Sequence, residues 1–515
     1  MFNVKFQEAI KTGYTFKGKT IPIGGAVLDG QVVIDSIVNL PLSTMNRHGL
    51  IAGATGTGKT KTLQKIVEQL SLAGVPTLSM DIKGDLSGLS QAGVINDKIQ
   101  SRVTSTGIAW NPHQFPVEFL SISEQKGTKM RATISEFGPV LLSKILELND
   151  TQGGIISLMF KYCDDNNLPL LDLQDFKKTL QYLTNEGKEA IEKEYGAIST
   201  TSTATIMRKI IELEEQGANN IFGEKSFEVE DLIRTDASGN GFVNILRLTD
   251  MQSKPKLFST FMLCLLTEIY NTFPEMGDVE KPKLCIFIDE AHLIFESATQ
   301  SLLDQIETII KLIRSKGVGI YFITQNPADV PASILGQLGL KVQHALRAFT
   351  AADNKVIKLT AQNYPISEFY DVEKLLTSLG MGEAIITALS EKGIPTSLVH
   401  TMLSAPESRM DVITDNEMNT IISRSAIAGK YNEVINRDSA YEILTKKLEV
   451  IANNQVIETT QNSSPASKEN TTKSASAEKG MLESLSKNTM VRQISRSVTT
   501  EIARGLMGMF FGKKR

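Results

Sequence analysis

The sequence predicts an α/β fold with a mostly parallel β-sheet, and three observations lead to this prediction. Short apolar segments alternate with segments whose apolar residues recur at helical spacing. A Gly-rich turn at residues 53–60 joins one such strand to one such helix. A second apolar strand, in KLCIFIDE, ends in two acidic residues. Strands that alternate with helices build βαβ units, and these units make parallel sheets.

The composition is that of an ordinary globular protein. The 515 residues suffice for two or three domains, and 41% are hydrophobic and 22% charged. The net charge of −4 confines any nucleic-acid contact to a local patch or to a channel between subunits. Cys163, Cys264 and Cys285 show no metal or disulfide spacing. With no signal-peptide pattern and no long apolar run, we expect a cytoplasmic protein.

Changes of pattern along the chain divide it into segments. A βαβ pattern covers the first part of the core, and strand–helix alternation resumes near residue 235 after a mostly helical stretch. A Ser/Thr/Asn-rich stretch with almost no apolar residue follows the last predicted core helices and is expected to be a disordered linker. The predicted segments are a short N-terminal β segment (1–45), the phosphate-loop core (46–100 and 235–405), a mostly helical insertion (101–234), a C-terminal helical region (406–453), the linker (454–480) and a basic amphipathic tail (481–515).

The turn GATGTGKT matches the phosphate-binding pattern G-x-x-x-x-G-K-[ST], with a strand before it and a helix after it. Its glycines allow a tight turn whose backbone N–H groups point at phosphate oxygens. Lys59 is expected to reach the β- and γ-phosphates, and the Thr60 hydroxyl to bind Mg²⁺. ATP and Mg²⁺ are therefore the predicted cofactors. The predicted nucleotide-binding residues are Gly53, Ala54, Thr55, Gly56, Thr57, Gly58, Lys59, Thr60 and Lys61.

The strand in LCIFIDEAHLIF has the Walker B pattern, an apolar strand that ends in an acid. Asp289 is expected to hold Mg²⁺ through water. Glu290 lies just beyond the strand, where a carboxylate can orient and polarise the water that attacks the γ-phosphate. We expect His292 to pack or hydrogen-bond near the site rather than act as the base.

A third buried strand, in GVGIYFITQ, ends in Thr324 and Gln325. A Gln amide can donate to a γ-phosphate and accept from the attacking water, so Gln325 is predicted as a catalytic γ-phosphate sensor. A separate strand between the phosphate loop and Walker B, a catalytic Glu and a polar sensor point away from GTPases and kinases. They predict a RecA-like P-loop NTPase of the type with an additional central strand and a catalytic glutamate.

Four segments together resemble the HerA-like branch of the HerA/FtsK ATPases: NRHGLIAGATGTGKTKTLQ…DIKGDLSGL, IFIDEAHLIF, IRSKGVGIYFITQNPADVP and QHALRAFTAADNK. The resemblance covers most of residues 1–450 and is closest to the bacterial family with a helicase HerA-like C-terminal domain. It implies a hexameric ring that hydrolyses ATP and moves double-stranded DNA. The short N-terminal part, the helical insertion and the tethered tail depart from archaeal HerA, so a nuclease partner and a role in end resection lie outside the prediction.

In such a ring each ATP lies at a subunit interface and takes a cation from the neighbouring subunit. An arginine finger of this kind is worth about 10³–10⁵ in rate. The favoured candidates are Arg47, ahead of the phosphate-loop strand, and Arg314 in IRSKG, with Arg347 as a third. The resemblance implies arginines near the nucleotide at the first two positions, one acting in trans. IKGDLSGLSQAG and DMQSKPK are candidate loops for DNA contact in the pore.

The C-terminal tail and two other functions stay open at this point. From Lys479 onward the chain has eight Lys or Arg against two Glu, with apolar residues at helical steps. This basic amphipathic segment suits DNA, an anionic membrane surface or an acidic patch of a partner protein. The protein could instead be a secretion- or conjugation-like ATPase at a membrane, or a nucleotide-gated assembly scaffold. Glu290 and Gln325 favour genuine hydrolysis.

Overall fold

The computed structural model describes residues 2–277, 279–295, 300–433, 435 and 437–461. The chain divides into two compact units. Of the described residues, the sheet unit comprises those within 2–130 and 227–433, and the helical unit comprises residues 131–226, 435 and 437–461. Each unit is built around its own buried residues.

The strands of the sheet unit form one sheet of twelve strands in the order β2-β1-β12-β11-β10-β3-β9-β8-β4-β7-β5-β6. From β10 to β6 every neighbouring pair is parallel, and from β2 to β10 every pair is antiparallel. The predicted mostly parallel sheet is therefore confirmed. The strands are β1 (Thr20–Leu28), β2 (Gln31–Pro41), β3 (Gly49–Ala52), β4 (Thr77–Asp81), β5 (Val117–Ser121), β6 (Thr128–Lys129), β7 (Val243–Arg247), β8 (Leu284–Ile288), β9 (Val318–Thr324), β10 (Leu340–Gln343), β11 (Glu383–Thr387) and β12 (Val399–Leu403).

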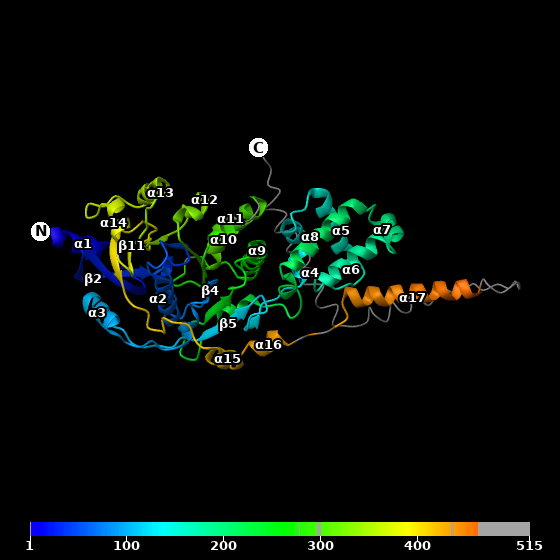
Figure 1. Ribbon diagram of the computed structural model, residues 1–515, viewed down its shortest axis with the longest axis horizontal. Coiled ribbons are helices and arrows are strands. Elements are labelled where there is room, and N and C mark those ends of the chain that lie inside the picture. The colour runs from blue at the N-terminus through cyan, green and yellow to red at the C-terminus, as the bar shows by residue number, and fades with distance from the viewer. Residues whose placement is uncertain (1, 278, 296–299, 434, 436, 462–515) are drawn as a thin grey trace. The chain divides into compact units, whose positions relative to one another are not determined.

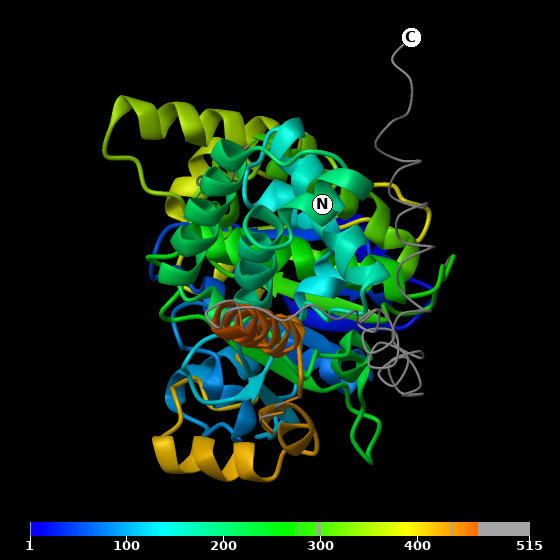
Figure 2. The same ribbon diagram turned by 90° about the vertical axis from the view of Figure 1, so that its right-hand side faces the viewer.

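The central parallel strands are buried on both faces, as parallel sheets require. On one face Ile51, Phe287 and Tyr321 pack with the apolar side of the helix that follows the phosphate loop. The longer helices after β7 and β8 carry the other large set of buried apolar side chains (Figure 1). The helices of this unit are α1 (Phe2–Tyr14), α2 (Lys59–Leu72), α3 (Asp97–Thr106), α9 (Pro255–Thr272), α10 (His292–Phe295), α11 (Gln300–Ile313), α12 (Ala332–Leu335), α13 (Ala351–Gln362), α14 (Val372–Ser378), α15 (Asp415–Ser423) and α16 (Ala428–Asn432). Figure 2 shows α15 as the golden helix at the lower margin of this unit.

The N-terminal segment differs from the prediction of strands and turns alone, because it begins with the helix α1. Phe6, Ile10 and Tyr14 recur every four residues on this helix and are buried in the core of the sheet unit. The Tyr14 hydroxyl donates to the carbonyls of Ser397 (2.7 Å) and Ile386 (3.1 Å). The four-residue spacing is a helical signal that lies in the sequence itself.

Residues 101–130 also differ from the prediction, which placed them in the helical insertion. Strand β5 pairs in parallel with β7, with Val117 opposite Val243, and the chain enters the helical unit only at Arg131. The partner strand lies more than a hundred residues further along the chain. Local patterns do not reveal such a pairing, so the boundary could not be read from the sequence.

The helical unit contains α4 (Ile134–Ile145), α5 (Asp150–Asp165), α6 (Leu173–Thr184), α7 (Lys188–Glu194), α8 (Thr200–Glu215) and α17 (Ala440–Gln461) (Figure 1). The N-terminus of α17 is held by Ala440, whose N–H donates to Pro169, and by Tyr441, whose N–H donates to Asp175. The predicted C-terminal region is therefore divided, with α15 and α16 in the sheet unit and α17 in the helical unit. Helix α17 runs to Gln461, so residues 454–461 are helical where a linker was predicted. The rest of the predicted linker and the basic tail lie outside the described residues.

Within the described part of the chain, no helix combines the length and apolar character needed to cross a bilayer.

Candidate nucleotide-binding and catalytic site

The phosphate loop, Asp289, Glu290 and Gln325 lie along one edge of the sheet. Strands β3, β9, β8 and β4 are consecutive neighbours and run parallel, so their carboxyl ends meet at the same edge. The phosphate loop follows β3, Gln325 follows β9, Asp289 follows β8, and Lys83 follows β4. Strand β9 lies between the phosphate-loop strand and the Walker B strand, as the sequence predicted.

The phosphate loop has backbone angles that glycine alone adopts easily. Gly53, Gly56 and Gly58 have φ angles of 150°, 77° and 114°. A Cβ on Gly53 would lie 2.5 Å from the Cβ of His344, so the loop is also in close contact with the segment after β10. The Lys59 ammonium lies within the loop and donates to the carbonyls of Gly53 (2.6 Å) and Ala54 (3.2 Å).

The loop fits a polyphosphate on two structural grounds. Helix α2 begins at Lys59 and no side chain caps its N-terminus, so the free N–H groups of its first turn face the loop. Burial lowers the pKa of Lys59, and the neighbouring charge of Lys83 lowers it further. Two cationic groups close to an uncapped helix terminus form an environment that favours an anion.

Asp289 and Glu290 are both buried, and Lys83 bridges them. The Lys83 Nζ lies 2.6 Å from Glu290 Oε1 and 3.7 Å from Asp289 Oδ2. Burial raises the pKa of Asp289 to about 6, against the opposing effect of Lys83. Burial raises the pKa of Glu290, but the hydrogen bond and charge of Lys83, together with His292 and Gln325, outweigh burial and leave that pKa below its usual value. Glu290 is therefore ionised at neutral pH.

His292 lies beside the same carboxylate, with its Nδ1 3.3 Å from Glu290 Oε2. Glu290 itself has a φ of 48°, in the left-handed region that side chains seldom adopt. Backbone strain of this kind often occurs at functional sites, where the surrounding structure holds it in place. Oε1 of Glu290 is thus paired with Lys83, whereas Oε2 is buried without a hydrogen-bond partner although His292 lies nearby.

Gln325 lies at the rim of the phosphate loop. Its Oε1 accepts from the Thr55 hydroxyl at 3.3 Å, and its amide also helps to lower the pKa of Glu290 by hydrogen bonding. The preceding residue, Thr324, is fully buried and hydrogen-bonds Asp329. Gln325 therefore connects the loop with the acidic pair, whereas Thr324 anchors the strand end.

Two residues of this site were missing from the predicted set. Lys83 follows β4 and reaches Glu290 only because β4 and β8 are neighbours in the sheet. Arg102 on α3 donates to the carbonyls of Met381 (2.7 Å), Gly382 (3.1 Å) and Leu403 (2.8 Å). Lys83 could have been found from the sequence, because it is a lysine two residues after the end of a predicted strand. Arg102 has no such local signal.

Lys61 was predicted to bind nucleotide, but its side chain is engaged elsewhere. Its ammonium donates to the Met410 carbonyl and to Gln64 Oε1 (3.3 Å). Met410 belongs to the segment after β12 that runs along α2. The helical rotation from Lys59 to Lys61 turns the side chain of the second lysine away from the loop interior, and nucleotide binding by Lys61 stays a prediction.

The three candidate arginines lie at two different edges. Arg47 precedes β3 and Arg314 precedes β9, so both lie at the amino ends of strands whose carboxyl ends carry the phosphate loop and Gln325. Asn46 Nδ2 donates to the Arg314 carbonyl at 3.5 Å and joins the two segments. Arg347 follows β10 at the loop edge, and its guanidinium donates to the Thr377 carbonyl at 3.1 Å.

The residues present fit a magnesium ion held largely by phosphate and water. Thr60 lies in the first turn of α2, and the buried carboxylate of Asp289 is 3.7 Å from its ion-pair partner Lys83, which is longer than a hydrogen bond. Among the described residues, no cluster of three or more His, Cys, Asp or Glu could by itself hold a metal. Mg²⁺ in nucleotide sites takes one or two protein oxygens and completes its shell with phosphates and waters.

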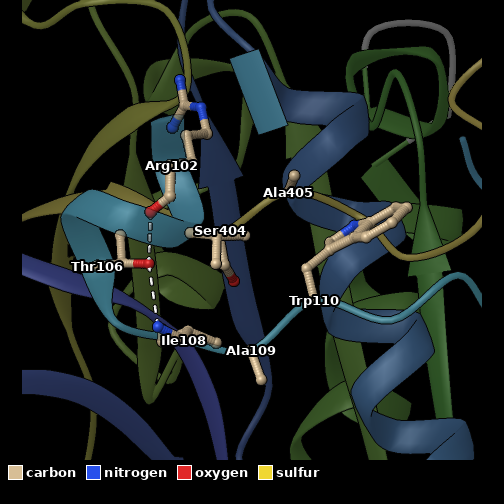
Figure 3. A pocket seen from close by; sticks show the side chains of 8 residues that line it. Arg102, Thr106, Ile108, Ala109, Trp110, Ser404 and Ala405 are labelled. Atoms are coloured by element: carbon tan, nitrogen blue, oxygen red, sulfur yellow. Dashed lines mark hydrogen bonds between the residues drawn. The ribbon is translucent and has the colours of Figure 1, made fainter. Parts of the chain in front are cut away.

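Two cavities of the described chain lie away from this site. One lies between α3 and the segment after β12, where Arg102, Thr106, Trp110 and Ser404 surround it (Figure 3). Its volume is about 10 Å³, which is the size of one water molecule. An open hollow of about 430 Å³ in the helical unit is lined by Lys177, Lys178, Tyr441 and neighbouring side chains.

The fold and the site define a P-loop ATPase with an additional strand between the phosphate-loop and Walker B strands. The chain belongs to the family described as helicase HerA-like C-terminal, whose model matches residues 28–515. This membership makes it a HerA/FtsK-type ATPase, as the four sequence segments predicted.

Known relatives carry the name of a DNA repair helicase. The DNA double-strand break repair helicase HerA of Sulfolobus acidocaldarius is 22% identical over 389 residues, which cover 71% of this chain and 68% of that protein. The protein of the same name from Saccharolobus solfataricus is 25% identical over 370 residues, with 70% and 66% covered. The chain thus spans about two thirds of the length of these relatives.

Solved structures of two bacterial proteins are also similar. The bacterial conjugative coupling protein TrwBdeltaN70 matches with a TM-score of 0.49 and 15% identity, over 79% of this chain and 94% of that one. VirB4 of Thermoanaerobacter pseudethanolicus matches with a TM-score of 0.48 and 13% identity, over 79% and 100%.

Proposed function

We propose that the protein is a ring-forming, Mg²⁺-dependent motor that hydrolyses ATP to move along double-stranded DNA. The observation that carries the proposal is the position of Glu290 and Gln325 at the ends of neighbouring strands beside the phosphate loop. A scaffold that only binds nucleotide needs no ionised carboxylate there. The helicase names of its relatives support DNA as the cargo.

The proposed reaction follows from the residues at this edge. Lys59 and the N–H groups of the α2 terminus hold the phosphates, and Gln325 orients the attacking water. The oxygen of this water bonds to the γ-phosphorus while Glu290 accepts a proton from the water. The bond between the γ-phosphorus and the bridging oxygen breaks, and its electron pair leaves with ADP. Mg²⁺, held by Thr60 and through water by Asp289, would offset the negative charge on the phosphates.

A hexameric ring supports this chemistry because Arg47 and Arg314 lie on the far edge of the sheet from their own loop. In a head-to-tail ring, the amino-end edge of one subunit can face the carboxyl-end edge of the next. One of these arginines would then reach the neighbour's γ-phosphate in trans. The residues after 461 lie outside the described chain, so contact of the basic tail with DNA, a membrane surface or a partner protein rests on the sequence alone.

The test is the ATPase rate with and without double-stranded DNA, for the wild type and for Glu290→Gln. We expect duplex DNA to stimulate the wild type, and Glu290→Gln to bind ATP while losing about 10²–10⁴ in rate, the usual contribution of a general base. Mass measurement with ATP should give a hexamer. A rate indifferent to DNA, with no DNA retained by Glu290→Gln in the presence of ATP, would refute a DNA motor and favour another cargo or a scaffold.

A further inference from the structure

The ion pair between Lys83 and Glu290 occupies the group that the reaction needs. The Lys83 ammonium lies 2.6 Å from Glu290 Oε1, and His292 Nδ1 lies 3.3 Å from Oε2. The ammonium occupies Oε1 and fixes the orientation of the carboxylate, while Oε2 is buried without a hydrogen-bond partner of its own. In this state of the protein, the proposed base is therefore restrained.

The position of Lys83 is set by the backbone and not by a flexible side chain alone. Asp81, at the end of β4, accepts from the N–H groups of Gly84 (2.7 Å), Asp85 (3.1 Å) and Leu86 (3.2 Å). These bonds fold residues 81–86 into a compact turn, called here the Lys83 turn. A Cβ on Gly84 would lie 3.1 Å from Thr249, and Gly84 has a φ of 78°.

The two partners differ in their access to solvent. The Glu290 side chain is 9% exposed, whereas the Lys83 side chain is 36% exposed. An ion pair that is buried on the carboxylate side is screened little by salt. The same lysine can still be approached from outside by a polyanion, because its exposed part lies on a loop at the edge of the sheet.

We propose that Lys83 is a positioning residue that restrains Glu290 until cargo displaces the Lys83 turn. In the resting protein the ammonium holds the carboxylate away from the attacking water and keeps the basal rate low. When phosphates of duplex DNA bind the Lys83 turn, the lysine exchanges its carboxylate partner for DNA, and Glu290 is freed. The restraint rests on the proposed role of Glu290 as the base, and the release step rests in addition on the proposed DNA function.

Lys83→Met tests the restraint in the full-length protein without DNA. We expect kcat for ATP to rise at least about threefold, with KM changed by less than about twofold, because the base is freed while the phosphate loop is untouched. Lys83→Arg retains a cation and should keep the low basal rate. The double variant Lys83→Met/Glu290→Gln should be inactive, which would show that the additional rate passes through Glu290.

Lys126→Met is the matched control, because Lys126 is an exposed lysine of the sheet unit whose nearest ion-pair partner, Asp415, is exposed too. It should leave the basal rate unchanged. Lys83→Gln serves as a second neutral variant if the methionine variant unfolds. A basal kcat that stays the same or falls in the neutral variants, while Lys126→Met is normal, would overturn the restraint, and a fall would show that Lys83 serves the phosphate directly.

Addition of duplex DNA tests the release. The wild type should be stimulated, and Lys83→Met should be stimulated less than about twofold, because its base is already free. If the basal rate rises in Lys83→Met but DNA stimulates neither protein, the restraint stands and the DNA function fails. If DNA stimulates both proteins to the same extent, release through Lys83 is refuted and the DNA function stands.

Discussion

The backbone N–H of Gly382 donates to the carbonyl of Thr57 at 2.9 Å, so the turn before β11 is bonded to the middle of the phosphate loop. Arg102 holds this turn from the other side through the carbonyls of Met381 and Gly382. A loop that must keep several N–H groups aimed at phosphates needs such outside support. The shape of the nucleotide site therefore depends on residues far from its motif.

Arg102→Ala should weaken nucleotide binding more than catalysis. Loss of the guanidinium removes a donor from the carbonyls of Met381, Gly382 and Leu403, of which Gly382 still accepts from the Leu403 N–H, and loosens the turn over Thr57. We expect KM for ATP to rise about threefold to tenfold with kcat nearly unchanged, the signature of lost uniform binding. Steady-state kinetics measure both. Lys98→Ala, on an exposed site of the same helix, is the control; a fall in kcat at constant KM would contradict the prediction.

His48 should make the protein sensitive to acid. Its Nε2 donates to the Ile310 carbonyl (2.8 Å) and its Nδ1 accepts from the Ile320 N–H (3.0 Å), which requires the neutral ring. Burial lowers its pKa from 6.5 to about 4. The unfolded chain therefore takes up the proton first as pH falls. The contribution of neutral His48 to the free energy of unfolding is fully present above about pH 6.5. It is lost as the pH falls toward 4, by about 3 kcal/mol at most.

Urea unfolding at pH 7 and pH 5 measures this effect. His48→Asn suits the positive φ of 57° at this position and cannot titrate. It should reduce the difference in unfolding free energy between the two pH values, whatever its effect on stability at pH 7. Burial also lowers the pKa of His344 to about 4, so His344 should still contribute to the pH dependence of the unfolding free energy in this variant. An undiminished pH difference in His48→Asn would contradict the assignment.

Glu68 should be a strong contributor to stability. It is fully buried on α2, and its carboxylate accepts from the N–H groups of Glu407 (2.8 Å) and Ser408 (2.9 Å) and from the Ser408 hydroxyl (2.5 Å). Glu68→Ala leaves these donors buried without an acceptor and should cost about 3–5 kcal/mol. Denaturant unfolding measures the loss.

Glu68→Gln is the informative comparison, because the amide oxygen can still accept while the charge is gone. It should cost less than Glu68→Ala. The neighbouring ion pair of Lys65 with Glu407 (3.1 Å) remains in both variants. Equal losses for Ala and Gln would show that the charge of Glu68, and not its acceptor oxygens, holds the segment after β12 against α2.

Mixed rings should reveal which arginine acts in trans. Arg47→Ala and Arg314→Ala should each assemble, and the variant lacking the finger should hydrolyse ATP about 10³–10⁵ more slowly. When this variant is mixed one-to-one with Lys59→Ala, about a quarter of the sites combine an intact phosphate loop with an intact arginine from the neighbouring subunit. The mixture should therefore recover about a quarter of the wild-type rate. Mixing Glu290→Gln with Lys59→Ala is the control and should recover nothing. Failure of both arginine variants to recover would rule out action in trans.

Local patterns were sufficient wherever the chemistry is contiguous in the chain. The phosphate loop, the Walker B strand and the strand ending in Gln325 each combine a strand and its polar end within a dozen residues. The order β3-β9-β8 was also predicted, because the strand that ends in the sensor Gln325 was expected between the phosphate-loop strand and the Walker B strand. Helix α1 was missed although Phe6, Ile10 and Tyr14 carry its periodicity.

The sequence by itself determined which residues can handle a nucleotide, because the identity and spacing of a loop motif are local properties. The tertiary structure decided which side chains meet. Lys83 and Glu290 are separated by some two hundred residues and face each other only because β4 lies beside β8. Arg102 and the Glu68 contacts depend in the same way on segments that return from distant parts of the chain. Pairings over such distances are set by packing of the whole core, and no local pattern contains them.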